Sequence, residues 1–362
     1  MGTRRIFSDS PIRDLWNQIS LLCSEDNARN FLEAKVSKKA PIDEKAKGIS
    51  FCIESAREYF QAAPEHNLTT SSLLYYYGTF SLFSALLLAN ISNSITLAEI
   101  EKSSKFGHGL GIIDAPGCPA LLAPHLFLLN RGFLFDFLNL NKIDVSHLLF
   151  ESKPKKWGHV VKDGENKLIS FVGLVKRIPE LQPLYDEIFG DWPHYLNYRL
   201  INYQDGPGEH KTTFEASFSD NSKYLCEEMI GHILPSLKGA KFIREPDPTS
   251  EQLVVSSLSP TQIRKNEKIP WYKSVLCPDV KIKPLKETIE NPLIYHFMLL
   301  YFLSILVRYR PNVWRNVISG LTEEYRPLIA KYLRVVERIV PNLFVDQLYN
   351  ERFLFAPHSY LG

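Results

Sequence analysis

The sequence lacks the features by which disulfide-bonded, zinc-binding and many catalytic proteins are recognised. Its five cysteines are odd in number and lie far apart, without a CxxC pair. Neither a disulfide framework nor a structural zinc site is indicated, and reduced thiols in a cytoplasm are expected. The chain also contains no GxxxxGK[ST] loop, no HExxH and no GxSxG motif. We therefore predict neither a metal ion nor a cofactor.

An excess of charge of one sign is lacking as well. Forty-two basic residues stand against 40 acidic ones, which gives a formal net charge of +2. This balance does not predict nucleic-acid binding, although it is compatible with a local basic patch. The first residues, "MGTRRIFSDSPIRDLW", contain no apolar run of the kind that signal peptides carry. We expect a cytoplasmic protein.

Two stretches lack charge altogether, Leu68–Ala98 and Asn291–Val307. The first is diluted by serine, threonine, asparagine and tyrosine, and the second is shorter than the roughly 20 residues that a spanning helix needs. Neither has a polybasic flank that would orient it in a membrane. A helix that is apolar on all sides also suits the centre of a large helical domain. We predict two buried core helices and no membrane partner.

The order of the patterns predicts an α+β protein that is mainly α. Helical patterns dominate residues 1–165 and return in residues 285–362, so we expect both ends of the chain to pack together in one helical bundle core. Residues 166–284 are expected to form a mixed α+β insertion. Short β-type runs separated by turns occur there at His194–Tyr203, Thr212–Phe218 and Glu251–Ser259.

Several expected elements bear on possible sites. The segment Phe106–Leu122 contains four glycines and two prolines, which favours a loop over a regular element. In the last part of the chain, helices are predicted at Asn291–Tyr309, Pro311–Ser319 and Glu323–Val340, followed by a short apolar piece near Leu343–Leu348.

The stretch "HGLG", from His108 to Gly111, is the first candidate site. Glycines let the backbone approach a ligand closely, and a histidine can donate or accept a proton near neutral pH. The alternative is a structural loop in which the histidine bonds a backbone carbonyl. The surrounding "GHGLG" does not have the GxGxxG spacing of a dinucleotide fingerprint.

The stretch "VRYRPNVW" is the second candidate. On one helix Arg308 and Arg310 would point about 200° apart, so they cannot form a fork. Pro311 disfavours helical geometry at the residue before it, which places Arg308 in the last helical turn. Tyr309 and Trp314 could stack on a base or on a guanidinium. The alternative is a charged helix end with a tryptophan that anchors the next helix.

Other signals are weaker. Two basic runs are interleaved with aromatic residues, Lys153–Gly164 and Arg264–Lys273. Such runs can follow a phosphate backbone, and solvated loops are the alternative. Helical ribonucleases can use an arginine and a histidine a few residues apart, but no histidine follows Arg308 within ten residues. The spacing from Arg352 to His358 encloses a proline, and we attribute it to chance at a frayed end.

In order along the chain, "SAREYFQAA", "LLYYYGTFSLFSALLLA", "HGLG" and "LLYFLSILVRYRPNVW" resemble the successive signatures of YaaC-like proteins. The resemblance extends from about Trp16 to somewhat beyond Trp314. It implies a bacterial cytoplasmic protein with a HEPN-like helical bundle, a type found in toxin–antitoxin and anti-phage systems as ribonucleases or inactive binding modules. The matching motif positions are Tyr76, Tyr77, Gly78, His108, Gly109, Arg308, Tyr309, Pro311 and Trp314.

These patterns lead to two functional hypotheses. The first is a binding or effector-partner protein in anti-phage defence that acts through nucleic acid or a protein partner, which includes a second copy of the chain. Its candidate binding residues are Tyr77, Gly109, Tyr309, Arg310 and Trp314. The second is a metal-independent nuclease of HEPN type, with His108 as acid or base and Arg308 stabilising phosphate charge. It requires these two residues to meet in space. A third possibility is that both motifs only pack the core.

Overall fold

The structure is a computed structural model that describes residues 2–35, 41–105, 107–118, 121–204, 212–220, 225–246, 251–320 and 322–356. Helices dominate and several small sheets accompany them, which confirms the predicted α+β, mainly α class. The chain divides into two compact units. Unit 1 comprises Met1–Val172 and Leu293–Gly362, the two ends of the chain, and unit 2 comprises Gly173–Pro292.

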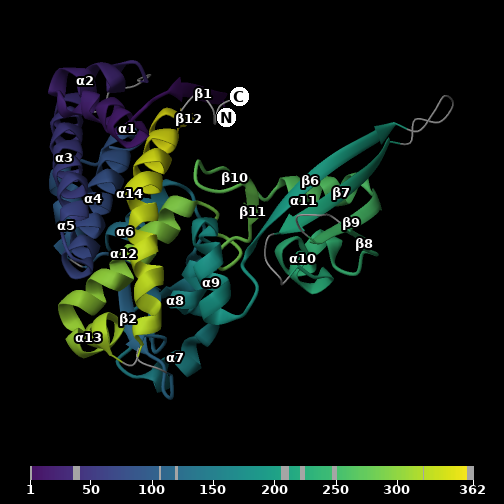
Figure 1. Ribbon diagram of the computed structural model, residues 1–362. Coiled ribbons are helices and arrows are strands. Elements are labelled where there is room, and N and C mark those ends of the chain that lie inside the picture. The colour runs from purple at the N-terminus through teal and green to yellow at the C-terminus, as the bar shows by residue number, and fades with distance from the viewer. Residues whose placement is uncertain are drawn as a thin grey trace. The chain divides into compact units, whose positions relative to one another are not determined.

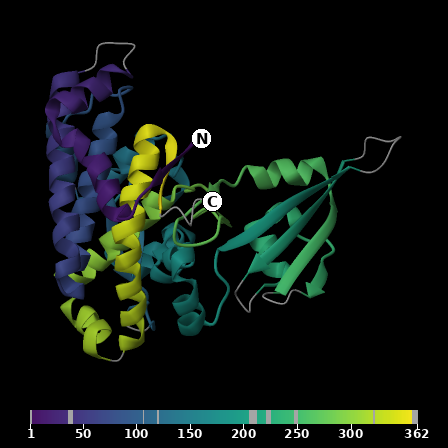
Figure 2. The ribbon, with the colours of Figure 1, turned by 45° about the horizontal axis from the view of Figure 1, so that its top comes forward.

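Unit 1 is a helical bundle with two small sheets (Figure 1). Its helices are α1 (Pro11–Ser20), α2 (Glu25–Glu33), α3 (Ile42–Ala62), α4 (Leu68–Ala89), α5 (Leu97–Lys105), α6 (Phe133–Leu140), α7 (Trp157–Asp163), α12 (Pro292–Tyr309), α13 (Pro311–Ser319) and α14 (Arg326–Tyr349). Both ribbon views show α14, in yellow, running beside the purple and blue helices α3 and α4 (Figures 1 and 2). Short 3-10 turns lie at Leu21–Cys23, Ala63–Glu65, Ser146–Leu148, Glu165–Lys167 and Glu323–Tyr325.

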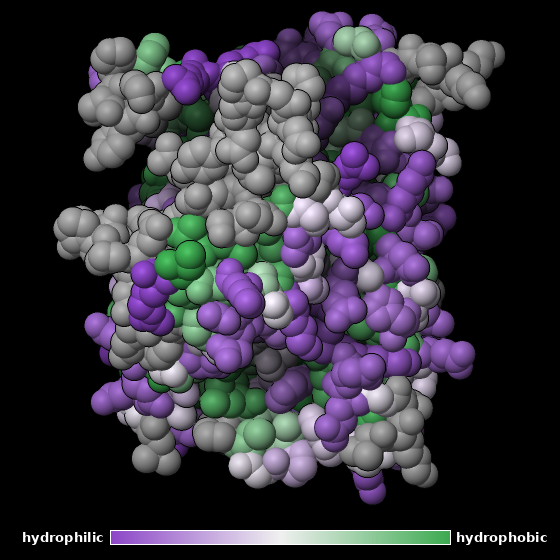
Figure 3. All heavy atoms as spheres, turned by 90° about the vertical axis from the view of Figure 1, so that its right-hand side faces the viewer, coloured by the Kyte–Doolittle hydropathy of each residue, from purple (hydrophilic) through white to green (hydrophobic). Residues whose placement is uncertain are grey.

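The two uncharged helices α4 and α12 form the centre of unit 1. Each is long and apolar enough to cross a membrane by length and composition, yet 72% of each apolar window is buried inside the protein. Burial of this extent is typical of helices in the core of a folded domain. The packing of α4 on α3 is close at Gly78, where an added Cβ would lie 2.6 Å from the Phe60 ring. On the face drawn in Figure 3, hydrophilic residues prevail over the described surface and hydrophobic ones form smaller patches.

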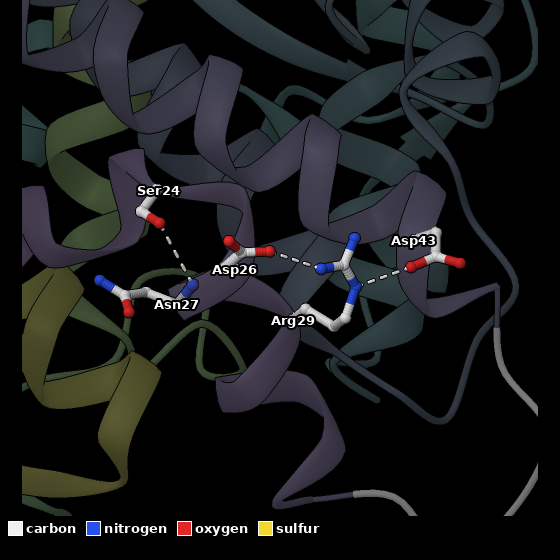
Figure 4. A network of polar contacts seen from close by, with 5 residues as sticks. All are labelled: Ser24, Asp26, Asn27, Arg29 and Asp43. Carbon is white, nitrogen blue, oxygen red and sulfur yellow. Dashed lines mark hydrogen bonds and ion pairs between the residues drawn. The ribbon is translucent and has the colours of Figure 1, made fainter.

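Polar contacts fix the position of α2 against the start of α3 (Figure 4). The Ser24 hydroxyl caps α2 by accepting a hydrogen bond from the backbone N–H of Asn27. The Arg29 guanidinium lies between two carboxylates, 2.7 Å from Asp26 and 2.8 Å from Asp43. Both carboxylates are largely exposed, so these ion pairs orient the helices and contribute little to stability.

The larger sheet of unit 1 corrects one prediction. Residues 106–122 were expected to be a loop, but Leu110–Asp114 is strand β2, which pairs antiparallel with β3 (Pro124–Leu129). Strands β4 (Leu149–Phe150) and β5 (Ile169–Ser170) also pair with β3. Gly111 permits the strand because its partner is Phe127, whose ring would lie 2.2 Å from an added Cβ. Gly111 therefore accommodates an aromatic ring and does not mark a turn.

The C-terminal helix corrects a second prediction. The helix expected to stop at Val340 continues as α14 through Pro341 to Tyr349. Buried Phe344 and Val345 continue its apolar face beyond the proline, so packing offsets the lost backbone hydrogen bond.

The segment expected to fray is also ordered. Strand β12 (Glu351–Ala356) pairs in parallel with β1 (Gly2–Phe7) at the other end of the chain. Arg338 in α14 donates hydrogen bonds to the Asn342 side chain and to the carbonyl of Phe355, and this fixes the strand on the helix. His358 lies outside the described residues.

Unit 2 contains a mainly antiparallel sheet of order β10–β11–β6–β7–β9–β8. Its strands are β6 (Tyr195–Gln204), β7 (Thr212–Asp220), β8 (Ile243–Pro246), β9 (Glu251–Leu258), β10 (Trp271–Tyr272) and β11 (Val280–Ile282). Its helices are α9 (Gln182–Phe189), α10 (Glu227–Ile233) and α11 (Pro260–Glu267), with α8 (Phe171–Val175) at its start and 3-10 turns at Pro179–Leu181 and Pro235–Leu237. Met229 and Ile230 of α10 pack with Leu196, Leu253 and Val255 of the sheet to form its core.

Candidate functional site

The end of α12 brings Arg308 to two tyrosines of α4. Its Nη1 donates to the Tyr77 hydroxyl at 3.2 Å, while Nε and Nη2 donate to the backbone carbonyl and the hydroxyl of Ser304, each at 3.2 Å. The guanidinium carbon lies 5.8 Å from the ring centres of Tyr76 and Tyr77 and 5.1 Å from that of Tyr309. These distances are in the range of cation–π attraction. Arg308 is thus held by its own helix and by two tyrosines more than two hundred positions away.

His108, from the HGLG motif, also lies against Tyr76. Its ring centre is 5.6 Å from that of Tyr76, 5.2 Å from that of Phe80 and 6.0 Å from that of Tyr301. Burial, and next the positive charge of Arg308, lower the pKa of His108 to about 4. The imidazole is therefore neutral at pH 7.

The structure therefore brings His108 and Arg308 to one aromatic cluster, in which both lie against Tyr76. Two buried polar atoms of the cluster, Nδ1 of His108 and the hydroxyl of Tyr76, have no hydrogen-bond partner among the described residues. Unsatisfied buried polar groups are costly, so they mark this cluster as a place where function can explain the cost. The hydroxyl of Tyr301 donates to the carbonyl of Leu110 at 2.9 Å and ties the segment after His108 to α12.

Gly109 has a packing role in this arrangement. Its φ of +77° favours glycine, and an added Cβ would lie 3.0 Å from the backbone nitrogen of Phe135 in α6. It is buried, so its backbone faces α6 and not an open space.

The two aromatic candidates beside the arginines differ in exposure. Tyr309 is 65% exposed, whereas Trp314 is only 6% exposed. The indole N–H of Trp314 donates to the hydroxyl of Thr69 at 2.8 Å, which anchors α13 to the start of α4. Of the two, Tyr309 has a ring face available for stacking.

Arg310 has a different partner from Arg308. Its Nη1 lies 3.0 Å from a carboxylate oxygen of Asp114 at the end of β2. Both residues line an open cavity of about 640 Å³. The other lining residues are Ile112, Ile113, Lys153, Pro154, Lys155, Lys156 and Trp157.

The cavity is strongly basic. Among its lining residues, three lysines and Arg310 face a single carboxylate, that of Asp114. All three lysine side chains are exposed. The Trp157 ring is supported from behind by the His125 ring, whose centre is 5.8 Å away in an edge-on arrangement.

In the second basic run, Arg264–Lys273, both aromatic residues have partners within the protein. Tyr272 is buried and its hydroxyl donates to the carboxylate of Glu180, while the ammonium of Lys281 lies 4.5 Å from the Trp271 ring centre. Among the described residues, no three His, Cys, Asp or Glu side chains gather closely enough to hold a metal ion.

A comparison with protein families complements this geometry. The family model described as YaaC-like protein matches residues 20–348. The chain belongs to the YaaC-like family. The match includes the tyrosine cluster and every residue that lines the basic cavity. No curated protein and no solved structure matches the chain.

Some site residues of this YaaC-like protein were not predicted from the sequence. Tyr301, Ser304 and Arg308 share one face of α12 at spacings of three, four and seven, a signal that was present but was not used. The basic run Lys153–Gly164 and Arg310 were both candidates from the sequence, and the structure brings Lys153, Lys155, Lys156 and Trp157 of that run to one cavity with Arg310. Their convergence was not predicted, because the walls come from β2, from residues 153–157 and from the residue after α12.

Proposed function

We propose that this YaaC-like protein binds single-stranded nucleic acid in the basic cavity of unit 1. The observation that carries the proposal is the convergence of Lys153, Lys155, Lys156, Arg310 and Trp157 on one open hollow. Trp157 is partly exposed, and basic side chains beside an accessible aromatic ring are the combination with which proteins hold a nucleic-acid backbone and stack a base. A volume of about 640 Å³ is also in the range of small-molecule sites, so a nucleotide fits it.

The expected binding is weakly dependent on sequence and strongly dependent on salt. The three lysines are flexible point charges, which suit phosphate oxygens and do not read base edges. For single strands, each phosphate contact contributes about 0.7 to the slope of log K against log salt concentration. Loss of three contacts should therefore lower that slope by about 2.

The test compares fluorescence anisotropy of a labelled single-stranded RNA and of its DNA counterpart at several salt concentrations. The variant Lys153→Gln/Lys155→Gln/Lys156→Gln is expected to bind at least tenfold more weakly with the flatter slope. The matched control Lys47→Gln/Lys102→Gln/Lys331→Gln loses the same charge from exposed lysines that do not line the cavity. Equal weakening in both variants, or no binding by the wild type, contradicts the proposal.

The tyrosine cluster supports a second proposal, a metal-independent nuclease. A neutral imidazole with an unpartnered Nδ1 can accept a proton, and the adjacent Arg308 can stabilise phosphate charge. RNA or DNA cutting in the presence of EDTA, lost in His108→Asn and Arg308→Gln, is expected if the cluster is catalytic. Absence of cutting by the folded wild type removes this proposal and leaves the binding proposal intact.

The wider role that we propose is that of a cytoplasmic binding or effector-partner protein in anti-phage defence. It is supported by the resemblance of the motif order to YaaC-like proteins, which implies a HEPN-like helical bundle of a type found in anti-phage systems. The test is the plating efficiency of phages on bacteria that carry the wild-type gene, no gene, or the triple-lysine variant. Protection by the wild type alone is expected, and equal plating on all three strains contradicts this role.

A further inference from the structure

Unit 2 contains a second group of basic side chains that the proposed function does not use. His194 precedes β6, His232 lies in α10 and Lys283 follows β11. The ammonium of Lys283 lies 3.1 Å from Nε2 and 3.3 Å from Nδ1 of His232. The ring centres of His194 and His232 are 5.0 Å apart. Three groups that can carry positive charge are therefore in direct contact.

Backbone hydrogen bonds hold two of these residues, His194 and Lys283, together. The N–H of Lys283 donates to the carbonyl of His194 at 2.7 Å, and the N–H of His194 donates to the carbonyl of Lys176 at 2.8 Å. The guanidinium of Arg177 donates to the carbonyls of Gly173, Lys283 and Pro284. Arg177 is thus a structural clamp that also adds a fixed positive charge beside the cluster.

Charge in this region is unbalanced. Besides the three members of the cluster, the charged groups that act on it are Lys176, Arg177, Asp191 and Glu287. Together with Lys283 they comprise three basic side chains against two carboxylates, and Asp191 is already paired with Lys176. Burial first, and then the neighbouring cations, lower the pKa values of His194, His232 and Lys283. A buried Nδ1 of His194 also has no hydrogen-bond partner among the described residues.

From this juxtaposition we propose that His194, His232 and Lys283 form a binding site for a phosphate-class oxyanion. A dianion against the Lys283 ammonium and the His232 ring would compensate the mutual repulsion of the cations. It would also favour protonated histidines, which donate from both ring nitrogens. Binding is therefore coupled to proton uptake.

The site takes a phosphate group whether it is free, part of a nucleotide or at the end of a nucleic acid. The Trp192 ring centre lies 6.4 Å from that of His232, so an aromatic surface accompanies the anion site. This surface favours a phosphate that carries a base. The inference concerns unit 2 and does not depend on nucleic-acid binding by unit 1.

The first experiment is isothermal titration calorimetry of the full chain with inorganic phosphate, adenosine monophosphate, and oligonucleotides with and without a 5′-phosphate. Lys283→Gln and His232→Gln are each expected to weaken phosphate binding at least tenfold. The matched control Lys241→Gln removes an exposed lysine of unit 2 and should bind like the wild type. The triple-lysine variant of unit 1 should also keep this binding, which separates the two proposals.

The second experiment measures sulfate affinity between pH 8 and pH 5.5, because sulfate remains a dianion throughout this range. Affinity is expected to increase as the pH falls, by up to about tenfold per pH unit for each linked proton. The ring-proton resonances of His232 should report a raised pKa in the presence of sulfate. Phosphate binding that is equal in wild type, Lys283→Gln and His232→Gln, or absent from all, overturns the proposal. Sulfate affinity independent of pH overturns the proton coupling.

Discussion

Acidification is expected to weaken the folded state of unit 1 through His108, because its imidazole is held neutral among aromatic rings. The pKa of His108 is lowered from 6.5 to about 4. As the pH falls, the unfolded chain takes up this proton first. The stabilising contribution of the neutral ring is therefore complete above pH 6.5 and is lost between about pH 6.5 and pH 4. At about 1.4 kcal/mol per pKa unit, the loss from pH 7.5 to pH 5 is about 2 kcal/mol.

The assay is urea unfolding of the wild type and of His108→Gln between pH 7.5 and pH 5. The variant has no titrating ring at this position, so the difference in unfolding free energy cancels the contributions of His296 and Asp346, whose pKa values are also shifted by burial. We expect the free energy of the wild type to fall by about 2 kcal/mol relative to the variant. A difference that stays constant within about 0.5 kcal/mol refutes the reasoning.

The contribution of Arg308 can be separated from that of burial. Arg308→Gln removes the positive charge but leaves the rings of Tyr76, Phe80 and Tyr301 around the imidazole. The pKa of His108, followed by NMR of its ring protons, should rise in this variant yet stay below 6.5, since burial is the larger cause. An unchanged pKa would show that the guanidinium does not act on the imidazole.

Three further predictions concern other parts of the molecule. Asp114→Asn removes the carboxylate that pairs with Arg310 and should tighten RNA binding severalfold in the anisotropy assay, whereas Glu101→Gln on the exposed side of α5 should not. Trp314→Phe and Thr69→Val remove the same hydrogen bond, so each should cost about 1 kcal/mol in urea unfolding and the double variant less than the sum. Burial raises the pKa of Asp346 to about 7. The stabilising contribution of the protonated carboxyl group is therefore complete below pH 3.8 and is lost as the pH rises through 7. From pH 5 to pH 8, the unfolding free energy of Asp346→Asn should therefore increase relative to that of the wild type.

Features with a local cause could be predicted from the sequence. The end of α12 at Tyr309 and the start of α13 at Pro311 follow from the restriction that a proline places on its neighbour. The buried positions of α4 and α12 follow from the absence of charge over more than fifteen residues in each. Strands β6, β7 and β9 of unit 2 follow from short β-type runs between turns, whereas the shorter strands β8, β10 and β11 were not predicted.

Features that depend on distant partners could not be predicted in this way. Glycine at position 111 indicated a loop until its cross-strand partner, Phe127, was known. Pro341 indicated a helix end, but apolar packing on both sides carries α14 past it. The pairing of β1 with β12 joins the two ends of the chain, and no local pattern specifies a partner at that separation.

The same distinction governs the two arginines of "VRYRPNVW". Their spacing predicted that they would not form one fork, and the structure gives Arg308 to Tyr77 and Arg310 to Asp114. The partner of Arg308 lies in α4, and the partner of Arg310 lies in β2. The sequence therefore predicted that the two side chains would point in different directions, but not which residues they would contact.

The exposure of the side chains favours the binding proposal for unit 1 over the nuclease proposal. A general acid or base must come within hydrogen-bond reach of its substrate, yet Nδ1 of His108 and the hydroxyl of Tyr76 are both buried. Catalysis there requires the aromatic cluster to open, and Arg308 opposes opening through its bonds to Tyr77 and Ser304. The lysines of the basic cavity are exposed and need no rearrangement to meet a phosphate. Of the two proposals, binding is therefore the one that needs no rearrangement of the folded state, whereas cutting would require a second state with His108 uncovered.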